Sequence, residues 1–262
     1  MEANIHESSI IGKSVDIGDN VKIGPFCVIE DNVSIGDNTV IKSHVTINEY
    51  VKIGRDNKIF SHADIGGLPQ DLKFKNKKSW VKIGNKNTIR EYATIHRSSK
   101  KGEKTIIGHR NFLMAYTHVA HDCVLGNDII IVNYSGLSGH VEVEDKAFLS
   151  GGVLVHQFVK IGAMAMIGGA SRITQDVLPY SLVSGNPPRV YGLNVVGLRR
   201  NRKSKKIRDS MKKALSISLD LKNKEKIIKK ITNHKIYDYE EIKHYVKFLE
   251  KSNRGILIRK NE

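Results

Sequence analysis

The sequence predicts a parallel β-helix built from hexapeptide repeats, and three observations support this fold class. Isoleucine recurs at every sixth residue from Ile5 to Ile65 without interruption. Four residues after most of these isoleucines comes a smaller or branched residue, such as Val15, Val21 or Cys27. Glycine often follows the isoleucine directly. A period of six matches neither an α-helix, with 3.6 residues per turn, nor an alternating strand, with a period of two.

Each hexapeptide is predicted to form a short strand and a sharp turn, with its first and fifth residues pointing inward. Three hexapeptides close a triangular coil of 18 residues, and successive coils stack at the spacing of neighbouring strands, about 4.8 Å. Residues 18 apart in the sequence should therefore lie above one another on the same edge of the prism. The expected fold class is mainly β, a triangular parallel β-helix with a small C-terminal helical domain.

The first block of coils is expected to run from the N-terminus to Gly66. Residues 67–82 break the register and contain Pro69, several lysines and the single tryptophan. We interpret this segment as a loop excursion that leaves a corner of the prism. Residues 98–105, rich in serine and lysine, are interpreted as a second, flexible excursion. From Ile107 the repeat resumes and continues for several coils.

Near Pro179 the repeat fades, and the period of the apolar residues becomes helical. Residues 181–194 contain two prolines and two of the glycines, which is typical of a linker or capping segment. Apolar residues at helical spacing then include Ile207, Met211, Ala214, Leu215, Ile242, Tyr245, Val246 and Leu249. We therefore expect a β-helix domain at 1–186 and a linker with a helical domain at 187–262, which would cover the open end of the solenoid.

The composition argues against a membrane-spanning or disulfide-stabilised protein. The chain has 262 residues, of which 40% are hydrophobic, but no apolar window of about 18 residues. Its start, MEANIHESSI, lacks the basic and then apolar order of a signal peptide, so we expect a cytoplasmic protein without stable membrane insertion. Cys27 and Cys123 occupy inward fifth positions, where we expect packed free thiols.

The net charge of +16 is concentrated in the C-terminal part of the chain. Residues 199–262 contain 21 lysines and arginines against 8 aspartates and glutamates. Such a segment suits nucleic acid, an anionic membrane surface or an acidic protein, although a solvated basic face is an equally good interpretation. Few aromatic residues interleave these charges, which disfavours nucleic acid.

The histidines of the second block are predicted to gather on one edge of the prism. Hexapeptides that begin at Val119, Leu137 and Val155 are 18 residues apart and should therefore stack. Their third positions are His121, Gly139 and Gln157. The further histidines beside these positions are His118, His140 and His156. Chance would seldom bring so many imidazoles together, so we expect a functional site on this edge.

The residue types at this edge suggest acid–base chemistry. His121 could serve as a general base near neutral pH, and Asp122 could orient it or stabilise its protonated form. Gly139 offers a backbone N–H that could stabilise an oxyanion. No serine or cysteine is obviously paired with the histidines as a nucleophile, which favours direct transfer. Clustered histidines also bind zinc, so a metal site is the rival interpretation.

Several short motifs add a resemblance to a known family. They are Gln70-Asp71-Leu72-Lys73, Ile95-His96-Arg97, His118-Val119-Ala120-His121-Asp122-Cys123, Ser138-Gly139-His140-Val141, His156-Gln157-Phe158 and Gly192-Leu193-Asn194. In this order they resemble the motifs of UDP-N-acetylglucosamine O-acyltransferases. The similarity extends over essentially the whole chain, including both excursions, the helical C-terminus and a closing Ser252-x-Arg254-Gly255.

The resemblance implies a left-handed β-helix and a homotrimer with active sites in clefts between subunits. It implies transfer of a (R)-3-hydroxyacyl group from acyl carrier protein to the 3-hydroxyl of UDP-N-acetylglucosamine, the first step of lipid A biosynthesis. The donor would be an acyl-phosphopantetheine on that carrier, with no other cofactor and no metal. Acyl carrier protein is acidic, which would suit the basic C-terminal segment.

The resemblance also assigns roles to particular residues. His121 would be the general base, Asp122 its partner, and the Gly139 amide the donor to the thioester oxygen. The residues implied in substrate binding are Gln70, Asp71, Lys73, His96, His118, His140, His156 and Gln157, with Asn194 and Arg200 at the nucleotide. Gly169 would mark the position that limits the length of the acyl chain. Because glycine has no side chain there, we expect a donor with a long 3-hydroxyacyl chain.

Three other functions remain as alternatives. One is an N-acyltransferase acting later in lipid A synthesis, which is less favoured because the chain begins directly in hexapeptides. Another is a zinc hydratase of the carbonic-anhydrase type on the same solenoid, which stoichiometric zinc would favour. A non-catalytic solenoid that binds ice or nucleic acid is the third, and the lack of regular outward threonine ladders argues against ice.

Overall fold

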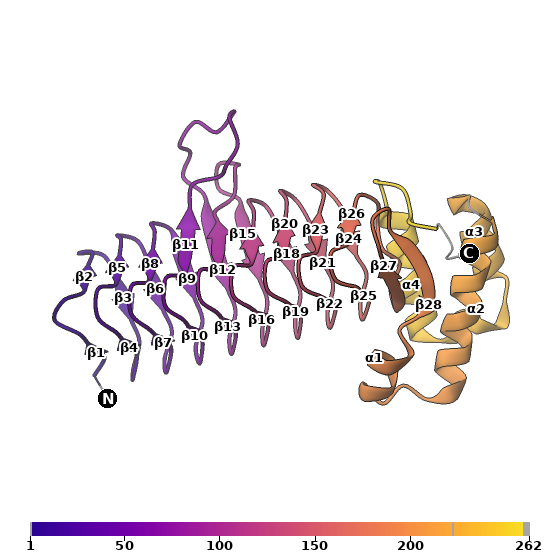
Figure 1. Ribbon diagram of the computed structural model, residues 1–262, viewed down its shortest axis with the longest axis horizontal. Helices are drawn as coiled ribbons and strands as arrows, with labels where there is room; N and C mark the ends of the chain where they lie inside the picture. Colours follow the sequence, from indigo (N-terminus) through magenta and orange to yellow (C-terminus); the bar gives the residue numbers. More distant parts are fainter. Residues whose placement is uncertain (1, 222, 259–262) are drawn as a thin grey trace.

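The computed structural model describes residues 2–221 and 223–258 and has the form of a triangular prism with helices at one end (Figure 1). Three sheets form the faces, and each sheet takes every third strand, so that the chain passes from the first sheet to the second and then to the third within each coil. Almost all neighbouring strands are parallel. The predicted parallel β-helix is therefore confirmed.

The first sheet runs the whole length of the prism. Its strands are β1 (Asn4–Ile5), β4 (Lys22–Ile23), β7 (Val40–Ile41), β10 (Lys58–Ile59), β13 (Thr88–Ile89), β16 (Phe112–Leu113), β19 (Ile130–Ile131), β22 (Phe148–Leu149), β25 (Met166–Ile167), β27 (Ser181–Ser184) and β28 (Arg189–Leu193). The last two strands pair antiparallel, which ends the coil and directs the chain towards the helices.

The other two sheets are built in the same way. The second sheet contains β2 (Ile10–Ile11), β5 (Val28–Ile29), β8 (Thr46–Ile47), β11 (Asp64–Gly67), β14 (Thr94–His96), β17 (His118–Val119), β20 (Gly136–Leu137), β23 (Leu154–Val155) and β26 (Arg172–Ile173). The third sheet contains β3 (Asp16–Ile17), β6 (Ser34–Ile35), β9 (Val51–Ile53), β12 (Trp80–Ile83), β15 (Lys104–Ile107), β18 (Val124–Leu125), β21 (Glu142–Val143) and β24 (Lys160–Ile161).

The core is the column of first and fifth residues inside the prism. Ile47, Ile59 and Leu137 are completely buried, as are the fifth-position residues Val45 and Val153. The strand register stays the same across the excursions, because each isoleucine still pairs with the isoleucine of the next coil. The two inward positions inferred from the repeat are therefore the ones that fill the core.

The two excursions leave the same edge of the prism, between the second and third sheets (Figure 1). The predicted ends of these excursions, at residues 82 and 105, were slightly too late. Trp80 already pairs with Lys104 in register, and β12 and β15 begin at these two residues. The physical reason is that each returning chain finds a neighbouring strand to pair with before its hexapeptide begins.

The edge between the first and second sheets carries a ladder of stacked rings. Its members are Phe26, His44, His62, Tyr92, Tyr116 and Tyr134. The tyrosine rings lie 4.8–5.0 Å apart, centroid to centroid, and are nearly parallel. We call this edge the aromatic edge. His44 and His62 are thus turn residues that stack on neighbouring coils.

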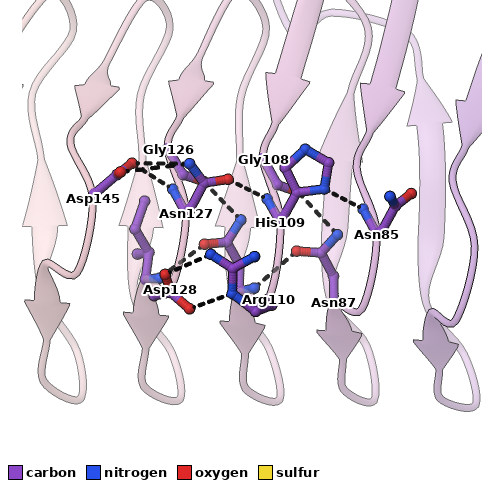
Figure 2. A network of polar contacts seen from close by, with 11 residues as sticks. Asn85, Asn87, Gly108, His109, Arg110, Gly126, Asn127, Asp128 and Asp145 are labelled. Carbon is purple, nitrogen blue, oxygen red and sulfur yellow. Dashed lines mark hydrogen bonds and ion pairs between the residues drawn. The ribbon is translucent and has the colours of Figure 1, made fainter.

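The edge between the third and first sheets contains a buried ladder of asparagines, of which Figure 2 labels Asn87. Asn57, Asn87 and Asn111 occupy inward fifth positions in consecutive coils and are almost fully buried. The Asn57 side-chain oxygen accepts hydrogen bonds from the backbone and side-chain amides of Asn87, at 2.9 and 3.0 Å. The Asn87 side chain in turn bonds Gly108 O and the Asn111 amide. Each amide therefore satisfies backbone groups of two coils.

The C-terminal helices are α1 (Val195–Arg200), α2 (Lys205–Leu221), α3 (Lys224–Thr232), the 3-10 helix η1 (Lys235–Asp238) and α4 (Glu240–Lys251). They pack through the faces expected from the helical period. Met211 of α2, Ile231 of α3 and Leu249 of α4 are buried. Tyr245 is also buried, and its hydroxyl lies 2.8 Å from that of Ser218. In the part of the chain that is described, no helix has the length and apolarity needed to cross a membrane.

The chain returns to the prism after α4. The backbone at Asp176 pairs with the segment around Ile256, and the Ser252 hydroxyl donates to the Asp176 carboxylate at 2.6 Å. The proposed domain boundary at residues 186 and 187 falls in the turn between β27 and β28. Both of these strands still belong to the first sheet. This division stays a prediction, and its outermost residues, Met1 and 259–262, lie outside the described residues.

The asparagine ladder predicts a specific loss of stability. The substitution Asn87→Ala should lower the free energy of unfolding by about 3 kcal/mol. It leaves Gly108 O and the Asn111 backbone N–H without partners in a buried site, and it removes one of the two donors to the Asn57 oxygen. Urea unfolding monitored by circular dichroism measures this loss.

The matched control is Asn4→Ala, since Asn4 is exposed on the first coil. It should change the free energy of unfolding by less than about 0.5 kcal/mol. Equal effects of the two substitutions would contradict a structural role for the buried ladder.

Candidate active site

The predicted histidine cluster lies on the edge between the second and third sheets, which we call the site edge. Asp122, His140 and Phe158 occupy equivalent turn positions in three consecutive coils, all with left-handed φ values of 61–65°. The His140 backbone N–H donates to His121 O at 3.0 Å, and the His121 and His140 ring centroids lie 5.3 Å apart. The expected stacking of residues 18 apart is therefore confirmed.

His121 and Asp122 form a hydrogen-bonded pair at the centre of this edge. The His121 Nδ1 atom lies 2.7 Å from Asp122 Oδ2. Because the carboxylate only accepts, Nδ1 carries the proton and the Nε2 lone pair is left for another partner. Both side chains are only slightly exposed, at 14% and 8%. This arrangement suits a general base supported by a carboxylate.

Gly139 lies directly beside the His121 ring. A Cβ atom at residue 139 would come within 2.5 Å of His121 Cε1 and 2.8 Å of Nε2. Only glycine therefore leaves room for this imidazole. Among the described residues, nothing accepts a hydrogen bond from the Gly139 N–H, which is available to a ligand.

His140 completes the centre of the edge. Its Nε2 atom lies 3.5 Å from Asp122 Oδ2, and its ring stacks on Phe158 with 4.6 Å between centroids. Burial lowers the pKa of His140, and this effect outweighs the opposing influence of the Asp122 charge. His140 is therefore neutral at pH 7 and can donate or accept a hydrogen bond.

His118, in the same coil as His121, and His96, one coil below, form a second pair of rings. Their centroids lie 4.8 Å apart, edge to face, and His118 Nδ1 lies 2.7 Å from the Thr94 hydroxyl. Burial lowers the pKa of His118 and lowers that of His96 to about 4. Within the described part of the chain, His96 Nδ1 is buried without a hydrogen-bond partner. Both imidazoles are neutral at pH 7.

The first excursion brings charge to the same edge. Burial is the main influence on the pKa of His140. Lys100, from the second excursion, lowers this pKa further, and Asp71 raises it. The Asp71 carboxylate also accepts the Lys73 backbone N–H at 2.9 Å. The side chains of Gln70 and Lys73 are exposed on the projecting loop. Of the three predicted residues here, the structure brings only Asp71 into electrostatic contact with the cluster.

A groove of about 430 Å³ extends from the cluster towards the C-terminal segment. Its lining includes Asp122, His140, Phe158, Lys160 and Arg254. The Arg254 guanidinium reaches His156 Nδ1 at 2.9 Å. Gln157 lies on the coil above Gly139, since the Phe158 N–H donates to Gly139 O. Beside Asp122 and His140, the groove therefore has an apolar wall at Phe158 and cationic walls at Lys160 and Arg254.

Three predicted residues lie away from this cluster within one chain. Gly169 lies on the aromatic edge, in the turn that follows β25. Asn194 is nearly buried, and its side chain caps α1 through the Gly197 N–H and donates to Met164 O. Arg200 is exposed at the end of α1, near the helical end of the prism (Figure 1).

His121, Asp122 and His140 could also hold a divalent metal ion. Their ligand atoms lie within 4.8 Å of one another, and they are the one such group that the described residues contain. However, the His121 proton already bridges two of these atoms, and an ion would have to displace it. The arrangement as it stands suits proton transfer better than metal binding.

The buried thiols do not supply a nucleophile. Both cysteines are free and buried, as expected. Burial raises the pKa of Cys27, and it raises that of Cys123, next to Asp122 in the chain, to about 12. Cys123 is therefore a protonated core residue at pH 7, and its Sγ atom lies 3.2 Å from Ser138 O.

Some residues at the site were missed by reasoning from the sequence. Ser98 and Ser99 both donate hydrogen bonds to Asp122, Thr94 contacts His118, and Arg254 contacts His156. Ser98 and Ser99 directly follow the His96-Arg97 motif, but they lie in an excursion where the period of six does not apply. Arg254 comes from the far end of the chain, so no spacing rule could link it to His156.

Family models match two parts of the chain. Residues 14–49 match the bacterial transferase hexapeptide model of six repeats. Residues 176–257 match the second domain of UDP-N-acetylglucosamine O-acyltransferase.

Curated relatives extend the similarity to almost the full length. The chain is 47% identical over 257 residues to acyl-[acyl-carrier-protein]--UDP-N-acetylglucosamine O-acyltransferase of Thermodesulfovibrio yellowstonii, covering 96% of this chain and 98% of that protein. It is 53% identical over 161 residues to the protein of the same name from Synechocystis, covering 62% of this chain. This second match spans only 58% of the Synechocystis protein's length.

Solved structures agree closely with the fold. The UDP-N-acetylglucosamine acyltransferase of Bacteroides fragilis superposes with a TM-score of 0.92 at 38% identity, covering 96% of this chain and 99% of that one. The enzyme of Moraxella catarrhalis also gives a TM-score of 0.92 at 38% identity, covering 97% and 99%. The fold is accordingly a left-handed parallel β-helix.

The contact between Gly139 and the imidazole predicts the effect of adding one methyl group. Gly139→Ala should displace the His121 ring and lower kcat at least about 100-fold, because both the base and the amide would lose their alignment. Circular dichroism should show an intact fold, and steady-state kinetics measures the loss.

Gly136→Ala, in β20 of the same coil, is the matched control. A Cβ atom there would make only an ordinary contact, 3.6 Å from Leu154. Activity should stay close to that of the unmodified protein, and an equal loss in both variants would exclude the proposed steric role of Gly139.

The buried imidazole of His96 predicts a loss of stability in acid. Its folded-state pKa of about 4 lies below the ordinary value of 6.5, so its stabilising contribution is complete above pH 6.5 and is lost as the pH falls towards 4. At pH 5 the loss is about 2 kcal/mol relative to neutral pH.

Urea unfolding at pH 7.5 and pH 5 tests this expectation. The variant His96→Gln should lose less stability between the two pH values than the unmodified protein does. The control His44→Gln, on the exposed aromatic edge, should lose the same amount of stability as the unmodified protein. An unchanged pH dependence in His96→Gln would show that this imidazole is not the group responsible.

Proposed function

The chain belongs to the UDP-N-acetylglucosamine O-acyltransferase family, and from this premise we propose that it transfers a (R)-3-hydroxyacyl group from acyl carrier protein to the 3-hydroxyl of UDP-N-acetylglucosamine. This reaction is the first step of lipid A biosynthesis. The observation that carries the proposal is the His121–Asp122 pair, with its free Nε2 atom beside the Gly139 amide.

The reaction follows from the groups at the site edge. His121 Nε2 takes the proton of the acceptor hydroxyl as its oxygen attacks the thioester carbonyl. The Gly139 N–H donates to the carbonyl oxygen, which becomes negatively charged in the tetrahedral intermediate. The intermediate then collapses, the C–S bond breaks, and the thiolate of phosphopantetheine receives the proton from His121. Asp122 stabilises the imidazolium that exists between the two proton transfers.

A thioester is already activated, so the protein has to supply orientation, a base and oxyanion stabilisation. No covalent acyl-enzyme is required, which agrees with the protonated state of Cys123. We assign His118, His140, His156 and Gln157 to the positioning of sugar and acyl groups along the groove, with His96 behind them. Asp71 and Lys73, with Gln70, would contact the substrates from the first excursion.

A trimer would complete the site. Gly169, Asn194 and Arg200 lie on other parts of a single chain, so they can contact the same substrate only if a second copy faces the site edge. A cleft between subunits would then combine the histidine cluster of one copy with the nucleotide contacts and the length-limiting Gly169 of its neighbour. This arrangement supports a homotrimer with three equivalent clefts.

The donor determines the remaining partners. Acyl carrier protein is acidic, and the helices that follow residue 199 are strongly basic, which supports docking of the carrier at the helical end. A carrier-bound donor also favours a cytoplasmic reaction. We assign no metal and no cofactor beyond the acyl-phosphopantetheine of the donor.

The decisive experiment is an assay with UDP-N-acetylglucosamine and a panel of acylated carrier proteins, with the products identified by mass. We expect a 3-O-acylated product and a preference for a 3-hydroxyacyl chain of fourteen carbons over one of ten, because Gly169 leaves the groove open. His121→Ala should fold normally and lose at least about 100-fold in kcat.

His44→Ala, on the aromatic edge, is the control and should retain activity. Turnover that persists in His121→Ala would remove this residue from the role of base. An acylated amine, formed only with an amino-sugar acceptor, would favour the N-acyltransferase. Stoichiometric zinc together with bicarbonate formation would favour the hydratase.

A further inference from the structure

Besides His121, two serines of the second excursion hold the carboxylate of Asp122. The Ser98 hydroxyl donates to Oδ1. The Ser99 hydroxyl donates to Oδ2 at 2.7 Å, and the Ser99 backbone N–H lies 3.2 Å from the same atom. Together with the His121 Nδ1–H, the carboxylate therefore accepts four hydrogen bonds, of which three come from this short segment.

The serine segment is itself firmly attached to the prism. Ser98 is completely buried, and its carbonyl oxygen accepts the Ser79 hydroxyl from the segment just before β12. The Ser98 N–H reaches Trp80 O, and its hydroxyl also receives the Lys100 N–H at 3.1 Å. The beginning of this excursion, expected from the sequence to be a flexible loop, is thus fixed on both sides.

The environment of Asp122 shows how strongly these donors act. Burial alone would raise the pKa of its carboxyl group, and it is the largest single influence. The hydrogen bonds from Ser98, His121 and Ser99 together outweigh burial and lower the pKa to about 2. The carboxylate is therefore kept ionised and in one orientation while largely shielded from water.

We propose that Ser98 and Ser99 are positioning residues, whose hydroxyl groups align the Asp122 carboxylate with the His121 imidazole and limit how basic His121 becomes. Both hydroxyl dipoles point their hydrogen atoms at the carboxylate and so offset part of its negative potential at His121. The inference rests on the proposed function for its kinetic consequences, but its structural part concerns the free protein alone.

The direction of the effect follows from electrostatics. Without the Ser99 hydroxyl, more of the Asp122 charge acts on the imidazolium and stabilises it. A general base must be unprotonated to act, so the ascending limb of the pH–rate profile moves to higher pH. The carboxylate also loses part of its fixed orientation, and kcat should fall about tenfold with little change in KM.

The first test is an NMR titration of His121 in the free protein. The variants are Ser99→Ala, the double variant Ser98→Ala/Ser99→Ala, and Ser99→Thr, which keeps the hydroxyl group. Ser99 is half-buried, so the single variants should fold. We expect the midpoint of the titration curve to move to higher pH in Ser99→Ala and further in the double variant, while the curve of Ser99→Thr matches that of the unmodified protein.

A double variant in which His121 titrates like the unmodified protein would overturn the proposal. So would an equal shift in Ser61→Ala, the control, whose hydroxyl contacts Ser43 away from the site edge. The second test is the pH profile of kcat/KM with acylated carrier protein. A uniform loss of activity without a shift of the ascending limb would indicate a merely structural role and would also contradict the proposal.

The two tests separate failure of this inference from failure of the proposed function. If the unmodified protein transfers no acyl group from any donor, the proposed function is wrong, and the NMR titration still decides whether the two serines control His121. If the unmodified protein is active and the titration shows no shift, only the positioning role is wrong.

Discussion

The structure depends on one repeated contact, the hydrogen bond between backbone groups of residues that lie one coil apart. The His140 N–H that donates to His121 O is a typical example. This contact fixes the vertical neighbour of every side chain, because a shift by one residue would turn the inward residues outward. Packing of isoleucine inside the prism and placement of histidine on its edge are therefore consequences of the same register.

Two edges of the prism use this register for different purposes. At the asparagine ladder, equivalent positions hold the same residue type, so Asn57, Asn87 and Asn111 satisfy one another and the backbone. At the site edge, equivalent positions hold different types, and the third position changes from His121 to Gly139. The change leaves space that the imidazole fills and an amide N–H that no other described residue uses. A ladder whose hydrogen bonds are all satisfied stabilises the fold. An interrupted ladder leaves polar groups free to bind a substrate and react with it.

Much of the fold and the centre of the site could be predicted because both follow the period of six. The neighbouring positions of His121, Gly139 and His140 came from counting alone. The serines at 98 and 99 could not be found in this way, since an excursion has no register until it packs against a strand. The contact of Arg254 with His156 depends on how the helices return the chain to the prism, which local spacing does not encode.

By itself, the sequence determined the inward columns, the stacking of coils and the edge on which the imidazoles gather, because each depends only on a short period and backbone sterics. The tertiary structure alone decided which donors surround Asp122, why residue 139 has no room for a side chain, and which imidazoles are buried enough to stay neutral. These properties depend on distances between segments far apart in the chain, and on the water that their packing excludes, neither of which a repeat records.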